Sequence, residues 1–203
     1  MTFGSVSAFL ARASTIEELA NGFSQRVRVV MKADAVVVRW SDEVNQRYLM
    51  LASNCFPAEM QEDERSLLAG ACACGSLRPD ARTRVIPIHH HGAEPIRHCA
   101  RAGYRNLVSV PVRLQQRMLG EVDLFFRSDV HLSADESELL DALASHLASA
   151  LEGLRAAALE REAAVGESNI TKPEIEIRND GNVPLQDLQA TWWLLLPVGA
   201  QPI

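Results

Sequence analysis

The chain contains, in close succession, the runs Leu107-Val-Ser-Val-Pro-Val112 and Met118-Leu-Gly-Glu-Val-Asp-Leu-Phe-Phe126. Both are rich in β-branched and aromatic residues, which are typical of strands. The short polar stretch from Arg113 to Arg117 separates them, so the sequence predicts two neighbouring strands of one sheet.

Two more strands are predicted upstream, at Ala35-Val-Val-Val-Arg-Trp40 and from Gln46 to Ser53. The turn-forming residues from Ser41 to Asn45 join them, which predicts a hairpin. Val85-Ile-Pro-Ile88 is a short fifth strand. Pro87 places this strand at a sheet edge, because proline cannot donate a ladder hydrogen bond.

Two capping boxes predict helix starts, at Ser14-Thr-Ile-Glu17 and Ser133-Ala-Asp-Glu136. In each, the serine oxygen can accept a hydrogen bond from the backbone N–H of the glutamate, while the glutamate carboxylate accepts one from the backbone N–H of the serine. Apolar residues then recur at spacings of three and four, predicting helices to about Met31 and Glu162. Two shorter helices are predicted at residues 58–73 and 95–102.

Strands and helices are therefore mixed around one central sheet, and the predicted fold class is α+β. Residues 1–13 form an N-terminal segment, and residues 14–160 form one domain that ends in the long helix. After Gly166 the sequence no longer continues the helical pattern, so residues 161–203 are an atypical tail to which we assign no role.

Composition narrows the function classes. The chain has 203 residues and a net charge of -6, without a block of basic residues, so nucleic-acid binding is not expected. No apolar run is long enough to span a membrane, and the N-terminus lacks the pattern of a signal peptide, so a cytoplasmic location is expected. The sequence has no nucleophile elbow, P-loop or His-Glu-x-x-His motif.

The four cysteines of the chain are Cys55, Cys72, Cys74 and Cys99. Thiolates are soft metal ligands and are readily oxidised, so a zinc ion, an iron–sulfur cluster or a redox thiol pair are alternatives. Their spacing matches no standard zinc ribbon. Buried cysteines that act only as small apolar residues are a further alternative, and these readings stay open.

The pattern Gly103-Tyr-Arg-Asn-Leu-Val-Ser-Val-Pro-Val112, the strand ending at Phe126 and Leu132-Ser-Ala-Asp-Glu136 together resemble the second half of GAF domains. The resemblance covers about residues 14–159. It implies a small-molecule sensor module with a central antiparallel sheet and a ligand pocket on one sheet face. All four cysteines fall in segments that roof this pocket, so the resemblance implies that they converge at one site.

The Cys-x-Cys-Gly sequence at Cys72 to Gly75 resembles sensor histidine kinases of the nitrate/nitrite-sensor type. That resemblance implies a sensory role in two-component signalling, in response to a small molecule or a redox signal. The chain departs from such kinases because it has neither the phospho-accepting histidine motif nor an ATP-binding domain. His98, Arg97 and Arg101 are candidate ligand-binding residues, since arginine can bind an anion such as nitrate by paired hydrogen bonds.

Two other functions are compatible with the same fold. Some GAF proteins reduce free methionine sulfoxide with pocket cysteines, and Cys72, Cys74 and Cys99 lie in comparable regions. The chain could also be a dimerisation module without a ligand. We expect a sensor rather than an enzyme, because the long helix suits signal transmission.

The last helix carries a heptad seam of apolar residues at Leu140, Leu143, Leu147, Ala150, Leu154 and Ala157. The first three are expected to pack on the sheet. The seam from Ala150 onward is expected to be exposed in a monomer and to form a homodimer contact.

Overall fold

A computed structural model of the protein describes residues 3–70, 81–88 and 98–168. The chain divides into two compact units, Met1–Ala164 and Val165–Ile203. The first unit contains the elements described below, and only the end of its last helix continues into residues 165–168.

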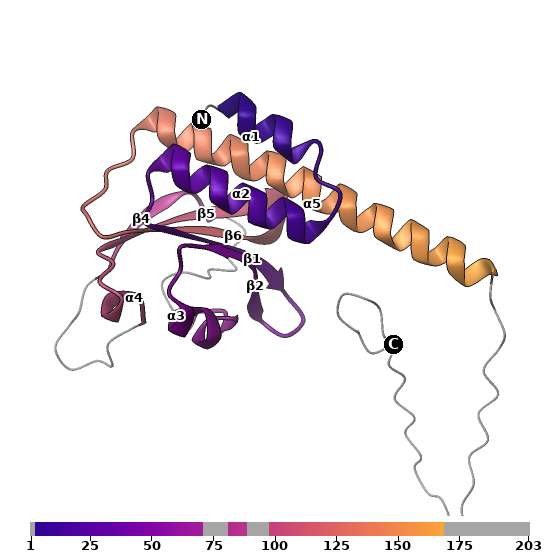
Figure 1. The fold of residues 1–203 in the computed structure, drawn as a ribbon, viewed down its shortest axis with the longest axis horizontal. Coiled ribbons are helices and arrows are strands. Elements are labelled where there is room, and N and C mark those ends of the chain that lie inside the picture. Colours follow the sequence, from indigo (N-terminus) through magenta and orange to yellow (C-terminus); the bar gives the residue numbers. More distant parts are fainter. Residues whose placement is uncertain (1–2, 71–80, 89–97, 169–203) are drawn as a thin grey trace, which may run out of the picture. The chain divides into compact units, whose positions relative to one another are not determined.

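Within the described residues, six strands form one antiparallel sheet with the order β3-β2-β1-β6-β5-β4 (Figure 1). The strands are β1 (Ala35–Asp42), β2 (Arg47–Asn54), β3 (Ser66–Leu68), β4 (Arg84–Pro87), β5 (Asn106–Leu114) and β6 (Arg117–Phe126). The predicted neighbouring strands at residues 107–112 and 118–126 are β5 and β6, which pair with each other, and β6 also pairs with β1. The predicted α+β class with a central antiparallel sheet is confirmed.

Helices cover both faces of this sheet. The helices are α1 (Phe3–Leu10), α2 (Ile16–Met31), α3 (Ala58–Asp63), α4 (His98–Arg101) and α5 (Ala134–Ser168). Figure 1 shows α1, α2 and α5 on one face, with α3 and α4 on the other. In the described residues, no helix is both long enough and apolar enough to cross a membrane.

Side chains alternate between the two faces because the period of a strand is two. Even-numbered residues of the central strands join the main core beneath α1, α2 and α5, among them Val36, Val38, Val108, Val110, Val122 and Leu124. Odd-numbered residues point to the opposite face, which α3 and α4 cover, except Leu119 near the start of β6, which joins the main core. There, Val37 and Phe125 belong to a second, smaller apolar cluster.

The helix predicted over residues 58–73 is wrong from residue 64 to residue 70, and residues 71–73 lie outside the described ranges. α3 ends at Asp63, and Ser66–Leu68 form strand β3 instead. This strand pairs with Arg47–Leu49 of β2, whose backbone groups would otherwise lack ladder partners along that edge. Leu67 and Leu68 are apolar residues that would suit a helix or a strand. Pairing with the edge of β2 makes this segment a strand.

Helix starts differ in how well they were predicted. At α2 the capping box lies one residue later than expected: Thr15 accepts the Glu18 amide, and Ser14 donates to the Glu18 carboxylate. The Ser133–Glu136 box at α5 is confirmed, with bonds in both directions. These hydrogen bonds hold the pKa of Glu136 below its usual 4.5. α1 was not predicted, and α4 begins at His98, with residues 95–97 outside the described ranges.

α5 is one continuous helix that runs further than predicted. Leu140, Leu143 and Leu147 are buried on the sheet, as expected. Ala150, Leu154 and Ala157 are half-buried rather than exposed, and the first two pack against the main core. Arg155 lies over the ring of Trp40, 5.9 Å from its centroid, so the sheet supports the helix as far as that residue.

Candidate functional site

The sheet face beneath α3 and α4 carries charged and polar side chains at strand positions that are buried. We call it the network face and define it by Arg39 of β1, Ser109 of β5, and Glu121 and Asp123 of β6. Each of the four is less than 5% exposed. Charged side chains are almost never fully buried unless they are paired, so their partners decide what this face does.

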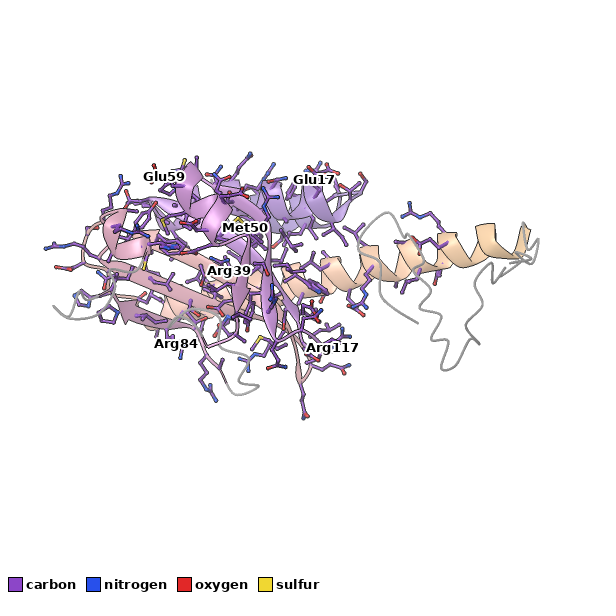
Figure 2. All side chains as sticks on the ribbon, turned by 90° about the horizontal axis from the view of Figure 1, so that it is seen from below. Glu17, Arg39, Met50, Glu59, Arg84 and Arg117 are labelled. Atoms are coloured by element: carbon purple, nitrogen blue, oxygen red, sulfur yellow. The ribbon has the colours of Figure 1, made fainter. Side chains whose placement is uncertain are left out.

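Arg39 is the centre of the network. Its Nε donates to Asp123 Oδ2 at 2.9 Å, and its Nη2 donates to Glu64 Oε2 at 2.6 Å. Its Nη1 donates to the Glu64 carbonyl oxygen at 2.9 Å. The guanidinium therefore ties the end of α3 to the middle of the sheet. Arg39 can be located in Figure 2 together with Met50, its register partner on β2.

The network runs diagonally across the strands. Arg39 stands opposite Glu121 in the β1–β6 register, yet its Nε bonds to Asp123 two residues further along β6. Ser109 stands opposite Asp123, and its hydroxyl donates to Glu121 Oε1 at 2.5 Å. Diagonal neighbours across strands are within reach of long side chains. The diagonal bond from Arg39 engages only the Oδ2 atom of Asp123.

Asp123 Oδ1 is buried and has no hydrogen-bond partner among the described residues. Asp123 as a whole is fully buried, with 0% exposure. A buried carboxylate oxygen without a donor costs about 1–3 kcal/mol or more, because it loses its water and gains nothing. Such an acceptor in the interior needs an explanation, and a bound group that donates to it is one.

An apolar cluster borders the network. Phe125 packs against Phe56 and Tyr104, with ring centroids 5.2 and 5.1 Å apart. Met60 and Cys99 are also buried members of this cluster. Burial raises the pKa of the Tyr104 hydroxyl above its usual value of 10.0. The face thus combines a charged centre with an aromatic border, which is a common makeup of small-molecule sites.

Two of the four cysteines lie in the described residues. Cys99 of α4 is buried in the apolar cluster, whereas Cys55 is exposed, with a positive φ of 56° just after β2. Cys72 and Cys74 lie outside the described residues. In residues 3–70, 81–88 and 98–168, no group of three or more His, Cys, Asp or Glu side chains could hold a metal ion. The four-cysteine site therefore stays a prediction.

The other predicted site residues have mixed outcomes. His98 lies with Nδ1 3.6 Å from Asp63 Oδ2 and 3.9 Å from Glu64 Oε1, so it borders the network through α3. Arg101 is exposed, and Arg97 lies outside the described residues. Of the neighbouring pair on α4, Cys99 is buried while His98 is half-buried, as expected for adjacent residues of a helix.

Arg39, Ser109, Glu121 and Asp123 were not predicted from the sequence as site residues. A signal was present, since each interrupts an apolar strand with a charged or polar residue at an odd-numbered position. Once the strands are registered, these residues share one face. Glu64 carried no such signal, because it follows a short helix that the sequence did not separate from β3.

Comparison with known protein families assigns this fold to a class. The family model for the GAF domain matches residues 15–151, and the chain belongs to the GAF domain family. A search of curated proteins found no match to this sequence.

Solved structures show the same fold. The GAF domain of an Acinetobacter phosphoenolpyruvate-protein phosphotransferase aligns with a TM-score of 0.61 at 18% identity, covering 76% of this chain and 92% of that one. A free methionine-R-sulfoxide reductase from Neisseria meningitidis, solved with its substrate, aligns at 0.63 and 15%, covering 76% and 89%. A domain assigned to a sensor histidine kinase of Sinorhizobium meliloti aligns at 0.56 and 15%, covering 74% and 99%. Identities this low establish the fold alone.

Proposed function

We propose that this protein is a sensory module that binds a small ligand on the network face and passes its bound state to α5, as part of two-component signalling. The location proposed for this activity is the cytoplasm. Membership of the GAF family supports a sensory role. The resemblance of Cys72 to Gly75 to nitrate/nitrite-sensor kinases supports the two-component setting.

The observation that carries the proposal is the difference between the two sheet faces. The face beneath α1, α2 and α5 is an apolar core, in which burial supplies stability. The network face instead buries Arg39, Glu121 and Asp123, an arrangement that contributes little net stability because desolvation opposes the ion pairing. Buried charges beside an aromatic border are therefore better explained by ligand recognition than by folding.

If the four cysteines converge, a thiol-bound cofactor is the proposed alternative to a small organic ligand. Cys99 belongs to the apolar cluster of the network face, and Cys55 directly precedes Phe56 of that cluster. Both cysteines thus border the same cluster. Together with Cys72 and Cys74, their thiolates would suit an iron–sulfur cluster or zinc.

A thiol-dependent methionine sulfoxide reductase is the second candidate, favoured by the burial of Cys99 beside the network. In that reaction a thiolate attacks the sulfoxide sulfur and a second cysteine resolves the intermediate as a disulfide, releasing methionine and water. Protein that is colourless and consumes free methionine sulfoxide with a thiol reductant supports this candidate. Brown protein with stoichiometric iron supports the sensor.

The output is proposed to be a homodimer formed through the heptad seam of α5 from Ala150 onward, where the helix reaches the end of the sheet and then continues past it (Figure 1). Replacing Leu154 by glutamate is expected to convert the dimer to a monomer in sedimentation velocity. The charge would enter the heptad seam, where the partner helix must exclude water. Any ligand bound at the network face should stay in place.

Leu159→Glu is the matched control. Leu159 is 53% exposed and lies five residues further along α5, which places it about 140° around the helix from Leu154. This variant should remain dimeric. A dimer that survives Leu154→Glu, or that is lost equally in both variants, would place the contact elsewhere. Thermal melting monitors whether the partly buried Leu154 also contributes to the core.

A further inference from the structure

We infer that the ligand presents a cationic hydrogen-bond donor, an ammonium or guanidinium group, to Asp123 Oδ1. This inference rests on the proposed function, because it names the ligand class for the same face of the sheet. Three observations carry it: the unpartnered acceptor, the charge of the buried groups and the aromatic border.

Asp123 offers a buried hydrogen-bond acceptor. Asp123 is fully buried, and Arg39 Nε occupies only its Oδ2. Its Oδ1 has no hydrogen-bond partner among the described residues. An ionised carboxylate accepts and does not donate, so the group that satisfies Oδ1 must bring an N–H or O–H of its own. A ligand that offers only acceptors would leave this oxygen as it is.

The buried charge favours a cation among such donors. In the described residues, the charged side chains that are buried are those of Arg39, Glu64, Glu121 and Asp123. Asp123 shares its guanidinium with a second carboxylate, because Arg39 pairs with both Glu64 and Asp123. A charge in the protein interior is stabilised by an opposite charge at short range, so a ligand cation at Asp123 brings these groups closer to balance. An anionic ligand group at this position would be repelled by the Asp123 carboxylate.

The border fits the rest of such a ligand. Phe125 is two residues from Asp123 on β6 and therefore lies on the same face, packed against Phe56 and Tyr104. Aromatic rings accept the apolar body of a ligand, and their faces attract cations. Arg127 shows the second property here, since its guanidinium lies 5.2 Å from the centroid of the Tyr104 ring.

The test compares five probes of similar size but different charge with the full chain. The cations are n-butylammonium and n-butylguanidinium, the neutral probes are n-butanol and butyramide, and the anion is butyrate. Saturation-transfer NMR detects weak binding, and thermal melting reports stabilisation by a ligand of the folded state. Both cations should bind and raise the melting temperature, whereas the neutral and anionic probes should not.

Asp123→Asn is the decisive variant. Its amide oxygen can still accept from Arg39 Nε, while its NH2 replaces Oδ1 with a donor. Cation affinity should fall by about 10- to 100-fold, the usual loss of a charge-assisted hydrogen bond. Glu121→Gln removes one charge from the same face without altering Asp123. The loss of cation affinity in this variant should be clearly smaller than in Asp123→Asn.

Equal binding of the cations to wild type and Asp123→Asn would overturn the inference. Preferential binding of butyramide or butyrate, abolished by Asp123→Asn, would also overturn the ligand class while supporting a ligand site on the network face. If none of the five probes binds and the protein retains no cellular ligand, the inference and the proposed function both fail.

Discussion

Replacing Arg39 by methionine is expected to destabilise the fold by about 3–5 kcal/mol, the typical cost of removing one partner of a buried ion pair. Methionine fills a similar length but donates no hydrogen bond. Asp123 and Glu64 would then keep buried negative charge without the guanidinium that now binds both. The measurement is the midpoint of urea unfolding at pH 7 compared with wild type.

Two further variants show why Arg39 matters. Arg65→Met is the control, because Arg65 pairs with Glu62 at an exposed site where both side chains are about three-quarters exposed. It should change stability by less than about 1 kcal/mol. The triple variant Arg39→Met, Glu64→Leu, Asp123→Leu should recover most of the lost stability, since apolar replacement of a buried ionic group is often neutral or favourable. A mild effect of Arg39→Met would show that the network is hydrated or weakly formed.

Gly120→Ala is expected to cost about 3 kcal/mol or more. A Cβ at this position would lie 2.0 Å from the Arg39 carbonyl oxygen, which belongs to the backbone of the paired strand β1. Backbone in a central strand cannot move aside without breaking ladder hydrogen bonds, so the strain is not easily relieved. The shift would also displace Arg39 and with it the network face.

Gly153→Ala is the matched control for that substitution. Gly153 is exposed in the interior of α5, and a Cβ there would meet nothing within 4 Å. Alanine should stabilise the helix by about 0.5–1 kcal/mol, because glycine is the poorer helix former. The two variants should therefore differ in sign in the same urea titration. Equal effects would contradict the close approach of β1 and β6 at Gly120.

The sequence predicted those elements whose local pattern and tertiary environment agree. The runs that became β1 and β5 are rich in valine, and those that became β2 and β6 carry aromatic residues among other apolar ones. Ser133 begins α5 with a complete capping box. β3 was missed because an edge strand of three residues has no period that can be read from sequence. Its formation depends on the free edge of β2, which is a property of the assembled sheet.

The candidate site was predicted less well than the fold. The cysteines were predicted as site residues because the chemistry of a thiol is evident from the residue type alone. Their convergence stays a prediction, since Cys72 and Cys74 lie outside the described residues. Arg39, Glu121 and Asp123 come from two strands far apart in sequence, and Glu64 comes from the end of α3. Their meeting depends on the β1–β6 register and on where α3 ends, and neither is a local property of the chain.

Native mass spectrometry of protein purified without oxygen and incubated with the small-molecule fraction of a cell extract tests the central claim most directly. It reports bound mass and oligomeric state together. The account predicts a dimer in which each wild-type chain carries an additional mass, whether an organic ligand or a metal cofactor. An organic cation should be absent from Asp123→Asn. A wild-type chain that shows only its own mass under these conditions would contradict ligand sensing at the network face.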